Sequence, residues 1–180
     1  FSTSSESQVS PRVGVVYELN NAITFYSSYS EGFLPLSGTD ASGDPFGFEY
    51  SDSFEVGAKF SYQGITGTLA LFDATKSNML VADPVNVGFS APIGKADSKG
   101  FELDVNTYIT DATAFNLSYA YIDATTANDI INADWGVPIE KGSPLVNVPK
   151  NNLNLTLSHQ TALMGKELEF GASYQYTSSR

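Results

Sequence analysis

The stretch "SKGFELDVNTYI", residues 98–109, alternates between apolar and polar side chains along almost its whole length. One parity carries Phe101, Leu103, Val105, Thr107 and Ile109, and the other carries Glu102, Asp104, Asn106 and Tyr108. A period of two indicates a β-strand whose two faces differ in polarity. Two arrangements fit this strand. In a soluble sandwich the apolar face is buried and the acids meet water, whereas in a transmembrane barrel the apolar face meets lipid and the acids point inward.

The same alternation recurs along the chain and predicts an all-β fold of antiparallel strands. No helical 3.6-residue pattern of useful length is present. The segments that we expect to form strands are residues 11–19, 22–30, 53–62, 65–76, 98–109, 114–123, 151–159 and 167–177.

The connections between these segments alternate between short and long. Short turns are expected near residues 20–21, 63–64, 110–113 and 160–166, and long loops near residues 31–52, 77–97 and 124–150. In an antiparallel sheet all the short turns then fall at one end and all the long loops at the other. Short turns on one side and long loops on the other are typical of a transmembrane β-barrel, so the loop pattern favours a barrel over a sandwich.

The two expected faces support a barrel. The polar face of the strands holds charged side chains at Arg12, Glu18, Glu55, Lys59, Glu102, Asp104 and Glu169. So many charges suit a lumen that is hydrated or plugged. The apolar face carries aromatic residues near strand ends, as in the aromatic girdles of membrane barrels. These are Tyr17, Tyr29, Phe54, Tyr62, Phe101, Tyr119, Tyr121, Tyr174 and Tyr176.

Composition narrows the possible partners. Twenty Asp and Glu residues against nine Lys and Arg give the 180-residue chain a net charge of -11, which disfavours a nucleic-acid partner. There is no cysteine, and therefore no disulfide or thiol chemistry. No segment approaches the roughly 18 apolar residues of a spanning helix. The chain opens with "FSTSSESQVS" rather than with Met, so we expect a piece of a longer protein.

Five segments resemble TonB-dependent siderophore receptors, in that family's order and over nearly all of residues 10–180. They are "SPRVGVVYEL" (10–19) with "ITFYSSYSEGFLPLSG" (23–38), "FEVGAKFSYQGITGTLALFDATKSNMLVADP" (54–84), "GKADSKGFELDVNTYITDATAFNLSYAYIDA" (94–124) and "LVNVPKNNLNLTLSHQ" (145–160).

The resemblance implies a barrel of about 22 strands with a plugged lumen in the bacterial outer membrane. The chain would then be one part of a single transmembrane barrel domain, with the plug domain and the final strands outside it. It also implies uptake of a ferric siderophore, hydroxamate types among them, captured by the outer loops and moved past the plug by the TonB energy-transducing complex. Iron would arrive inside the siderophore, and no cofactor would bind the protein directly. Outer-membrane lipid and lipopolysaccharide would surround the barrel.

Catalysis finds little support in the sequence. The single histidine, His159, stands at the end of an expected strand, and no nucleophile or orienting acid is recognisable for it. Metal-ligand spacing of the His/Cys kind is absent. We therefore expect a transporter rather than an enzyme.

The long loops carry candidate ligand-binding residues. Aromatic faces with a polar handle suit an amphipathic iron chelate, and packing of the loops onto one another is the alternative explanation. The candidates are Phe33, Phe46, Tyr50 and Trp135, the last being the only tryptophan.

Charged residues give two further hypotheses. On the polar face Arg12, Glu55, Lys59, Glu102 and Asp104 are expected to contact the plug, or else to pair across strands. The loop acids Asp40, Asp44, Glu49, Asp129 and Asp134 could bind Ca²⁺ or attract a cationic substrate, but without EF-hand-like spacing a solvated acidic surface is favoured.

Two functions of other classes stay open at this point. One is a non-energised barrel, such as a porin or a small eight-stranded membrane protein. The other is a soluble β-rich binding or adhesion domain.

Overall fold

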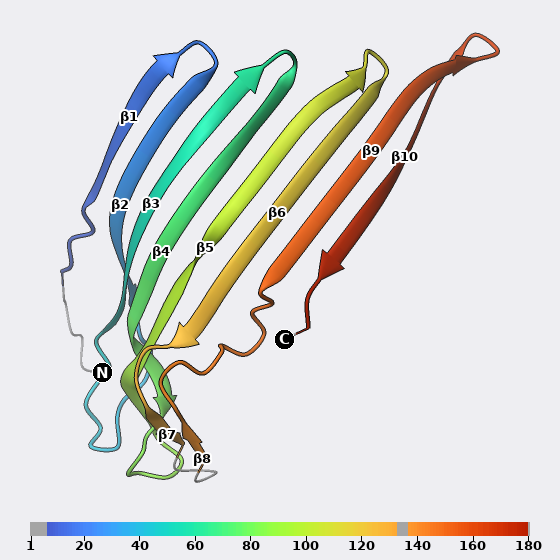
Figure 1. The fold of residues 1–180 in the computed structure, drawn as a ribbon. Helices are drawn as coiled ribbons and strands as arrows, with labels where there is room; N and C mark the ends of the chain where they lie inside the picture. Colours follow the sequence, from blue (N-terminus) through green and yellow to red (C-terminus); the bar gives the residue numbers. More distant parts are fainter. Residues whose placement is uncertain (1–6, 133–136, 180) are drawn as a thin grey trace.

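Eight antiparallel strands form a single sheet in the computed structural model, which describes residues 7–132 and 137–179. The order is β1-β2-β3-β4-β5-β6-β9-β10, so each strand lies beside its neighbour in sequence (Figure 1). The strands are β1 (Arg12–Asn20), β2 (Ile23–Pro35), β3 (Phe48–Tyr62), β4 (Ile65–Ala82), β5 (Ser90–Thr110), β6 (Thr113–Thr126), β9 (Asn151–Leu163) and β10 (Lys166–Thr177). A separate hairpin, β7 (Ile130–Asn132) with β8 (Val137–Ile139), lies inside the third long connection.

All eight expected strands are confirmed, and several run further than the alternation indicated. β2 and β3 stay paired without a slip as far as Pro35 opposite Phe48. β4 and β5 stay paired as far as Ala82 opposite Ser90, with register shifts between Ser77 and Val81. The backbone ladder continues there, but neither face is uniformly apolar. A periodicity argument depends on an apolar face and therefore ends where that face ends.

The register sorts the side chains onto two faces of different polarity. Residues directly opposite each other share a face, and one such row contains Tyr17, Phe25, Ala58, Leu69, Leu103, Tyr119, Leu153 and Tyr176. The next row, on the opposite face, contains Glu18, Thr24, Lys59, Thr68, Asp104, Ser118, Asn154 and Gln175. We call these the apolar face and the polar face. All nine aromatic residues expected on the apolar face lie on it.

Two of the short connections are tight turns in which both central residues have positive φ. Gln63 and Gly64 between β3 and β4 both have positive φ, at 50° and 82°, and Met164 and Gly165 between β9 and β10 have φ of 53° and 75°. Two such residues in succession form the type I′ turn that matches the twist of a hairpin. The last short turn is therefore smaller than the expected 160–166.

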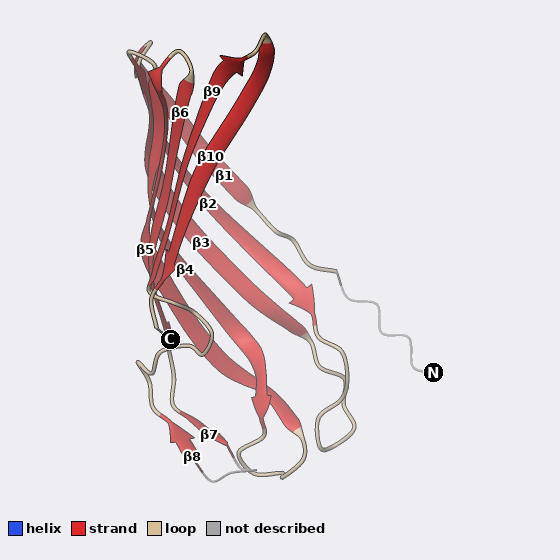
Figure 2. Ribbon diagram, turned by 90° about the vertical axis from the view of Figure 1, so that its right-hand side faces the viewer, coloured by secondary structure: helices blue, strands red, loops and turns tan. Residues whose placement is uncertain are grey.

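The long connections gather at the opposite end from the turns (Figure 1). Figure 2, turned by 90°, shows the β7–β8 hairpin beyond the ends of the main strands on that side. Residues 143–150 return along the edge of β6, where Leu145 donates its backbone N–H to Ala124 and Ile122 donates to Lys150, both at 2.9 Å. Part of the expected loop 124–150 is thus ordered against the sheet.

No large side chain among the described residues is fully buried. Val15 is 67% exposed, Leu71 53% and Phe170 57%, although all three lie on the apolar face. The accessible surface is 12486 Å², against about 8500 Å² for a compact monomer of this mass. A single sheet with two uncovered faces does not support the soluble sandwich. No helix among the described residues is long and apolar enough to cross a membrane.

Candidate functional site

Small residues on the polar face leave room around the charged side chains. One row across the sheet reads Tyr26, Gly57, Ala70, Glu102, Ala120 and Asn152. Glu55 stands one row further toward the loops, opposite Phe72 of β4, and Lys59 stands one row toward the turns. All five residues expected on this face, Arg12, Glu55, Lys59, Glu102 and Asp104, lie on it. Their contact with a plug stays a prediction.

Tyr26 also lies on the polar face, although it was not among the residues expected there. Its ring lies across the neighbouring strand, because a Cβ added to Gly57 would stand only 2.6 Å from Cε1, Cζ and the hydroxyl oxygen of that ring. Lys59 Nζ lies 5.8 Å from the ring centroid, within the range of a cation–π contact. Glu55 and Glu102 lie on the same polar face as this ring.

A second polar cluster lies next to Glu102, across β5, β6 and β9. The Ser118 hydroxyl donates to Asp104 Oδ1 at 2.5 Å. Together with Glu102, Asn152 and Asn154, these residues border a shallow hollow of about 180 Å³. Carboxylates beside amide and hydroxyl groups can accept several hydrogen bonds from one cationic partner. The surface is therefore suited to a guanidinium or ammonium group.

Two of the four aromatic ligand candidates lie at the rim of the sheet. Phe33 and Tyr50 pair directly across β2 and β3, and with Phe48 they form a cluster in which the Phe33–Phe48 centroids are 5.2 Å apart. The register places this cluster on the same face as Tyr29 and Phe54, the apolar one. A ligand in the lumen could contact these rings only at the outer edge of the sheet, because they lie on the face away from the lumen.

The other two candidates belong to the long connections. Phe46 packs on Gly38 in a compact turn, where its N–H donates to the Gly38 carbonyl at 3.1 Å, as the loop-packing alternative expects. Trp135 lies outside the described residues. Ligand binding by the four aromatics stays a prediction.

Most of the loop acids make local contacts. Asp40 accepts the N–H groups of Ser42 and Asp44, and Asp129 accepts the N–H of Lys141 at 2.7 Å. Glu49 forms an ion pair of 2.9 Å with Lys76, and Asp134 lies outside the described residues. Within residues 7–132 and 137–179, no group of three or more potential ligands could hold a metal ion.

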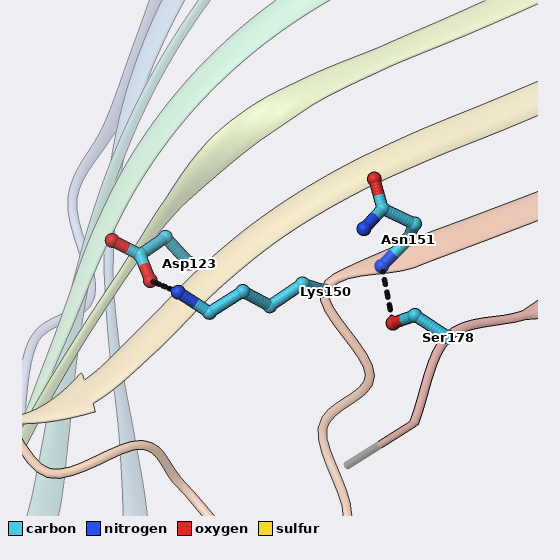
Figure 3. A network of polar contacts seen from close by, with 4 residues as sticks. All are labelled: Asp123, Lys150, Asn151 and Ser178. Carbon is cyan, nitrogen blue, oxygen red and sulfur yellow. Dashed lines mark hydrogen bonds and ion pairs between the residues drawn. The ribbon is translucent and has the colours of Figure 1, made fainter.

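The outer ends of β6, β9 and β10 are tied together by polar contacts (Figure 3). Lys150 Nζ lies 2.8 Å from Asp123 Oδ1, and the pKa of this lysine, which precedes β9, is raised by that carboxylate. Asn151 N–H donates to the Ser178 hydroxyl at 3.1 Å, and the Tyr119 hydroxyl donates to Asn151 Oδ1 at 2.7 Å. These contacts fix the point where the third long connection enters β9.

His159 and Asp83 make contacts that stabilise the local structure. His159 Nδ1 and Thr113 Oγ1 lie 2.8 Å apart, and the His159 ring stands 5.2 Å from the ring of Phe170. In the connection between β4 and β5, Asp83 accepts the Asn86 amide together with the N–H groups of Asn86 and Val85. These hydrogen bonds lower the pKa of the Asp83 carboxyl.

Comparison with known proteins gives a consistent result. Residues 1–180 match the family described as TonB dependent receptor-like, beta-barrel. The metal-pseudopaline receptor CntO of Pseudomonas aeruginosa is 35% identical over 156 residues, which are 86% of this chain and 21% of the receptor. The ferrichrome outer membrane transporter/phage receptor of Escherichia coli is 32% identical over 152 residues, 83% of this chain and 19% of the transporter.

The fold is also similar to that of solved outer-membrane receptors. The alcaligin outer membrane receptor FauA of Bordetella pertussis superposes with a TM-score of 0.70 at 24% identity, covering 96% of this chain and 30% of that structure. The chain spans about a fifth of the length of these two curated relatives.

Proposed function

Because the chain belongs to the TonB-dependent receptor β-barrel family, we propose that it is part of the barrel of an outer-membrane receptor that takes up ferric siderophores. The observation that carries the proposal is a single antiparallel sheet with one apolar and one polar face, neither of which is covered by another described part of the chain. Lipid covers the apolar face and an aqueous or plugged lumen covers the polar face. Strands outside residues 1–180 pair with the free edges of β1 and β10 to close the barrel.

The polar face supports contact with a plug domain elsewhere in the whole protein. Glu55, Glu102 and Asp104 offer carboxylates, and Arg12 and Lys59 offer cations, from strands whose backbone is fixed by ladder hydrogen bonds. A plug that carries complementary charges is held there until the TonB complex acts on it. Energy transduction then belongs to the plug and its partner, while this segment supplies the wall.

Ligand capture is proposed for the long connections at the outer end. Iron enters inside its chelator, so the protein needs aromatic and polar surfaces rather than metal ligands. Phe46 lies in the connection between β2 and β3, and Trp135 is a loop residue by sequence expectation, whereas Phe33 and Tyr50 occupy the apolar side of the rim. Substitution of the two loop residues is therefore expected to weaken binding more than substitution of the rim pair.

Uptake of radioactive iron by cells tests the function. The full-length receptor is expressed in a host that lacks its own ferric-siderophore receptors, with and without TonB, and is supplied with ferric hydroxamates, other ferric siderophores and metal–pseudopaline. Saturable uptake that requires TonB is expected for at least one ferric siderophore. Uptake that is non-saturable and independent of TonB would instead establish a porin-like channel and overturn the proposal.

A further inference from the structure

A hollow opens at the outer end of the polar face, where β1 begins beside β2 and β3. Its volume is about 440 Å³. The lining includes Arg12, Gly32 and four serines, which are Ser10, Ser30, Ser51 and Ser53. One guanidinium and four hydroxyl groups thus come together in a space that is large enough for part of a small ligand. We call it the Arg12 hollow.

The register places the strand residues of this lining on the polar face. Arg12 stands directly opposite Ser30, and this row continues across β3 and β4 to Ser98 of β5. In the next row outward Gly32 faces Ser51, and a Cβ added to Gly32 would stand only 2.8 Å from Ser51 Oγ. The Ser51 hydroxyl therefore lies over the glycine, on the same face of the sheet as the Arg12 guanidinium.

The polar groups of the Arg12 hollow have hydrogen-bonding capacity to spare. Within residues 7–132 and 137–179, no ion pair or hydrogen bond engages the Arg12 guanidinium or the serine hydroxyls of the lining. Glu31 also borders the hollow, but it belongs to the apolar face, where the Tyr29 hydroxyl donates to its Oε1 at 2.8 Å. A guanidinium with hydroxyl donors around it matches an anionic oxygen group, above all a carboxylate.

The depth of the hollow in the proposed barrel determines what can reach it. Ser30 and Ser53 are adjacent in sequence to Tyr29 and Phe54, which pair on the apolar face near the outer ends of their strands. Aromatic residues in that position mark the membrane interface. The hollow therefore lies in the luminal wall at about the level of the outer interface, where a captured ligand passes and lipid does not. The rim aromatics face the other way, so recognition by this part of the wall is polar.

We infer that Arg12, with the hydroxyls of Ser30 and Ser51, forms a luminal subsite that binds a carboxylate of the incoming ferric chelate. The inference rests on the proposed function and deepens it, because it names an anionic chelate as the substrate class. It assigns Arg12 to the ligand rather than to the plug. The subsite holds a peripheral group of the chelator and does not touch the iron. Arginine suits this task because its planar fork can donate two parallel N–H bonds to one carboxylate.

Binding of one ferric hydroxamate in three charge states tests the subsite. Ferrioxamine B carries a free amine, which is acetylated to give a neutral chelate or succinylated to place a carboxylate at the same position. Equilibrium dialysis of the three radioactive iron complexes against the full-length receptor in detergent gives their dissociation constants. We expect the succinyl derivative to bind at least about tenfold more tightly than the acetyl derivative, which is the ratio that one charge-assisted hydrogen bond supplies.

Variants of the exposed Arg12 assign the preference to the hollow, and folded migration on a gel verifies each barrel. Arg12→Gln should abolish the preference by weakening binding of the succinyl derivative alone. Arg12→Lys keeps the charge without the paired donors, so an intermediate preference is expected. Lys99→Gln is the matched control, because Lys99 follows Ser98 of the Arg12 row but lies on the apolar face, and it should leave the preference unchanged. Gly32→Ala should displace the Ser51 hydroxyl and reduce the preference in part.

Several results would overturn the inference while the proposed function stands. They are equal binding of the acetyl and succinyl derivatives, tighter binding of the cationic parent, and no binding of the succinyl derivative. A preference that survives in Arg12→Gln, or that is lost equally in Lys99→Gln, would also overturn it. The proposed function is decided by the uptake experiment, in which saturable, TonB-dependent uptake of any ferric siderophore leaves it standing. Failure to take up every siderophore would overturn both.

Discussion

Lys150 forms an ion pair with Asp123, with 2.8 Å between Nζ and Oδ1, at the point where the third long connection joins β9 (Figure 3). The same lysine accepts the Ile122 N–H through its carbonyl at 2.9 Å. Backbone and side chain thus hold residues 143–150 against the edge of β6. A connection anchored in this way presents the hairpin β7–β8 from a fixed base.

Breaking this ion pair is expected to loosen the connection without unfolding the sheet. Lys150→Gln or Asp123→Asn should increase the rate at which protease cleaves residues 143–150 in the folded receptor. Exchanging the two charges in Asp123→Lys/Lys150→Asp should restore much of the protection. Lys76→Gln, which breaks the separate Glu49–Lys76 pair, is the control and should not affect that segment. Equal cleavage in all variants would contradict the anchoring role.

The Lys150–Asp123 ion pair is lost at high pH, when Lys150 loses its proton. Because Asp123 raises the pKa of Lys150 in the folded protein, the pair stabilises the connection fully below the ordinary lysine pKa of about 10.4. This stabilisation is lost as the pH rises through the raised value. The protection of residues 143–150 should therefore decline only in strongly alkaline buffer, and Lys150→Gln should show no such decline.

The two faces predict opposite responses to one substitution. Leu69 and Thr68 are adjacent on β4, and the register places Leu69 on the apolar face and Thr68 on the polar face. Arginine on the lipid side near the middle of a bilayer destabilises a barrel by about 2–4 kcal/mol. Leu69→Arg should therefore lower the urea midpoint of the barrel in vesicles far more than Thr68→Arg, which has Asp104 opposite. The reverse ranking would show that the faces are assigned the wrong way round.

The β3–β4 turn predicts a local effect on stability. Gly64 has a φ of +82°, and a side chain in the left-handed region costs roughly 1–2 kcal/mol. Gly64→Ala should destabilise the barrel by about that amount in urea titrations. Gly47→Ala is the matched control, because an added Cβ there meets nothing within 4 Å and no positive φ is involved. Equal midpoints for the two variants would show that position 64 does not require glycine.

The sequence was informative where side-chain polarity and backbone conformation change together. Phe101, Leu103 and Val105 alternate with acids, so their strand and its faces could be predicted. Residues 31–35 and 48–52 form strands without such a contrast, and their pairing depends on continuation of the neighbouring ladder. β7 and β8 have three residues each, which is too short for any period to be recognised.

The candidate site divides in the same way. The parity of Glu55, Glu102 and Asp104 within their strands was enough to place them on the polar face. The parity that places Tyr29 on the apolar face puts Tyr26 on the polar face, but nothing in "ITFYSSYS" marks Tyr26 as the partner of a residue on another strand. Its partner Gly57 is recognisable only after the β2–β3 register is known. Contacts between strands require the register, which the sequence of one strand does not contain.

The turn at Asp83 predicts a response to acid in the second long connection. Its Oδ1 accepts the N–H groups of Val85 and Asn86 at 2.8 and 3.0 Å, and its Oδ2 accepts the Asn86 amide at 2.9 Å. These bonds favour the ionised carboxylate and hold the pKa of Asp83 below its ordinary value. Because the folded pKa is lowered, the carboxylate stabilises the turn fully above the unfolded value of about 3.9, and this stabilisation is lost as the pH falls through the folded value.

The measurement is hydrogen exchange of the Val85 and Asn86 amides. Their protection relative to the unfolded chain should decline only below about pH 4. In Asp83→Asn the protection should be lower at neutral pH and should not change across that range, and an identical acid-dependent decline in both proteins would show that another group controls the turn.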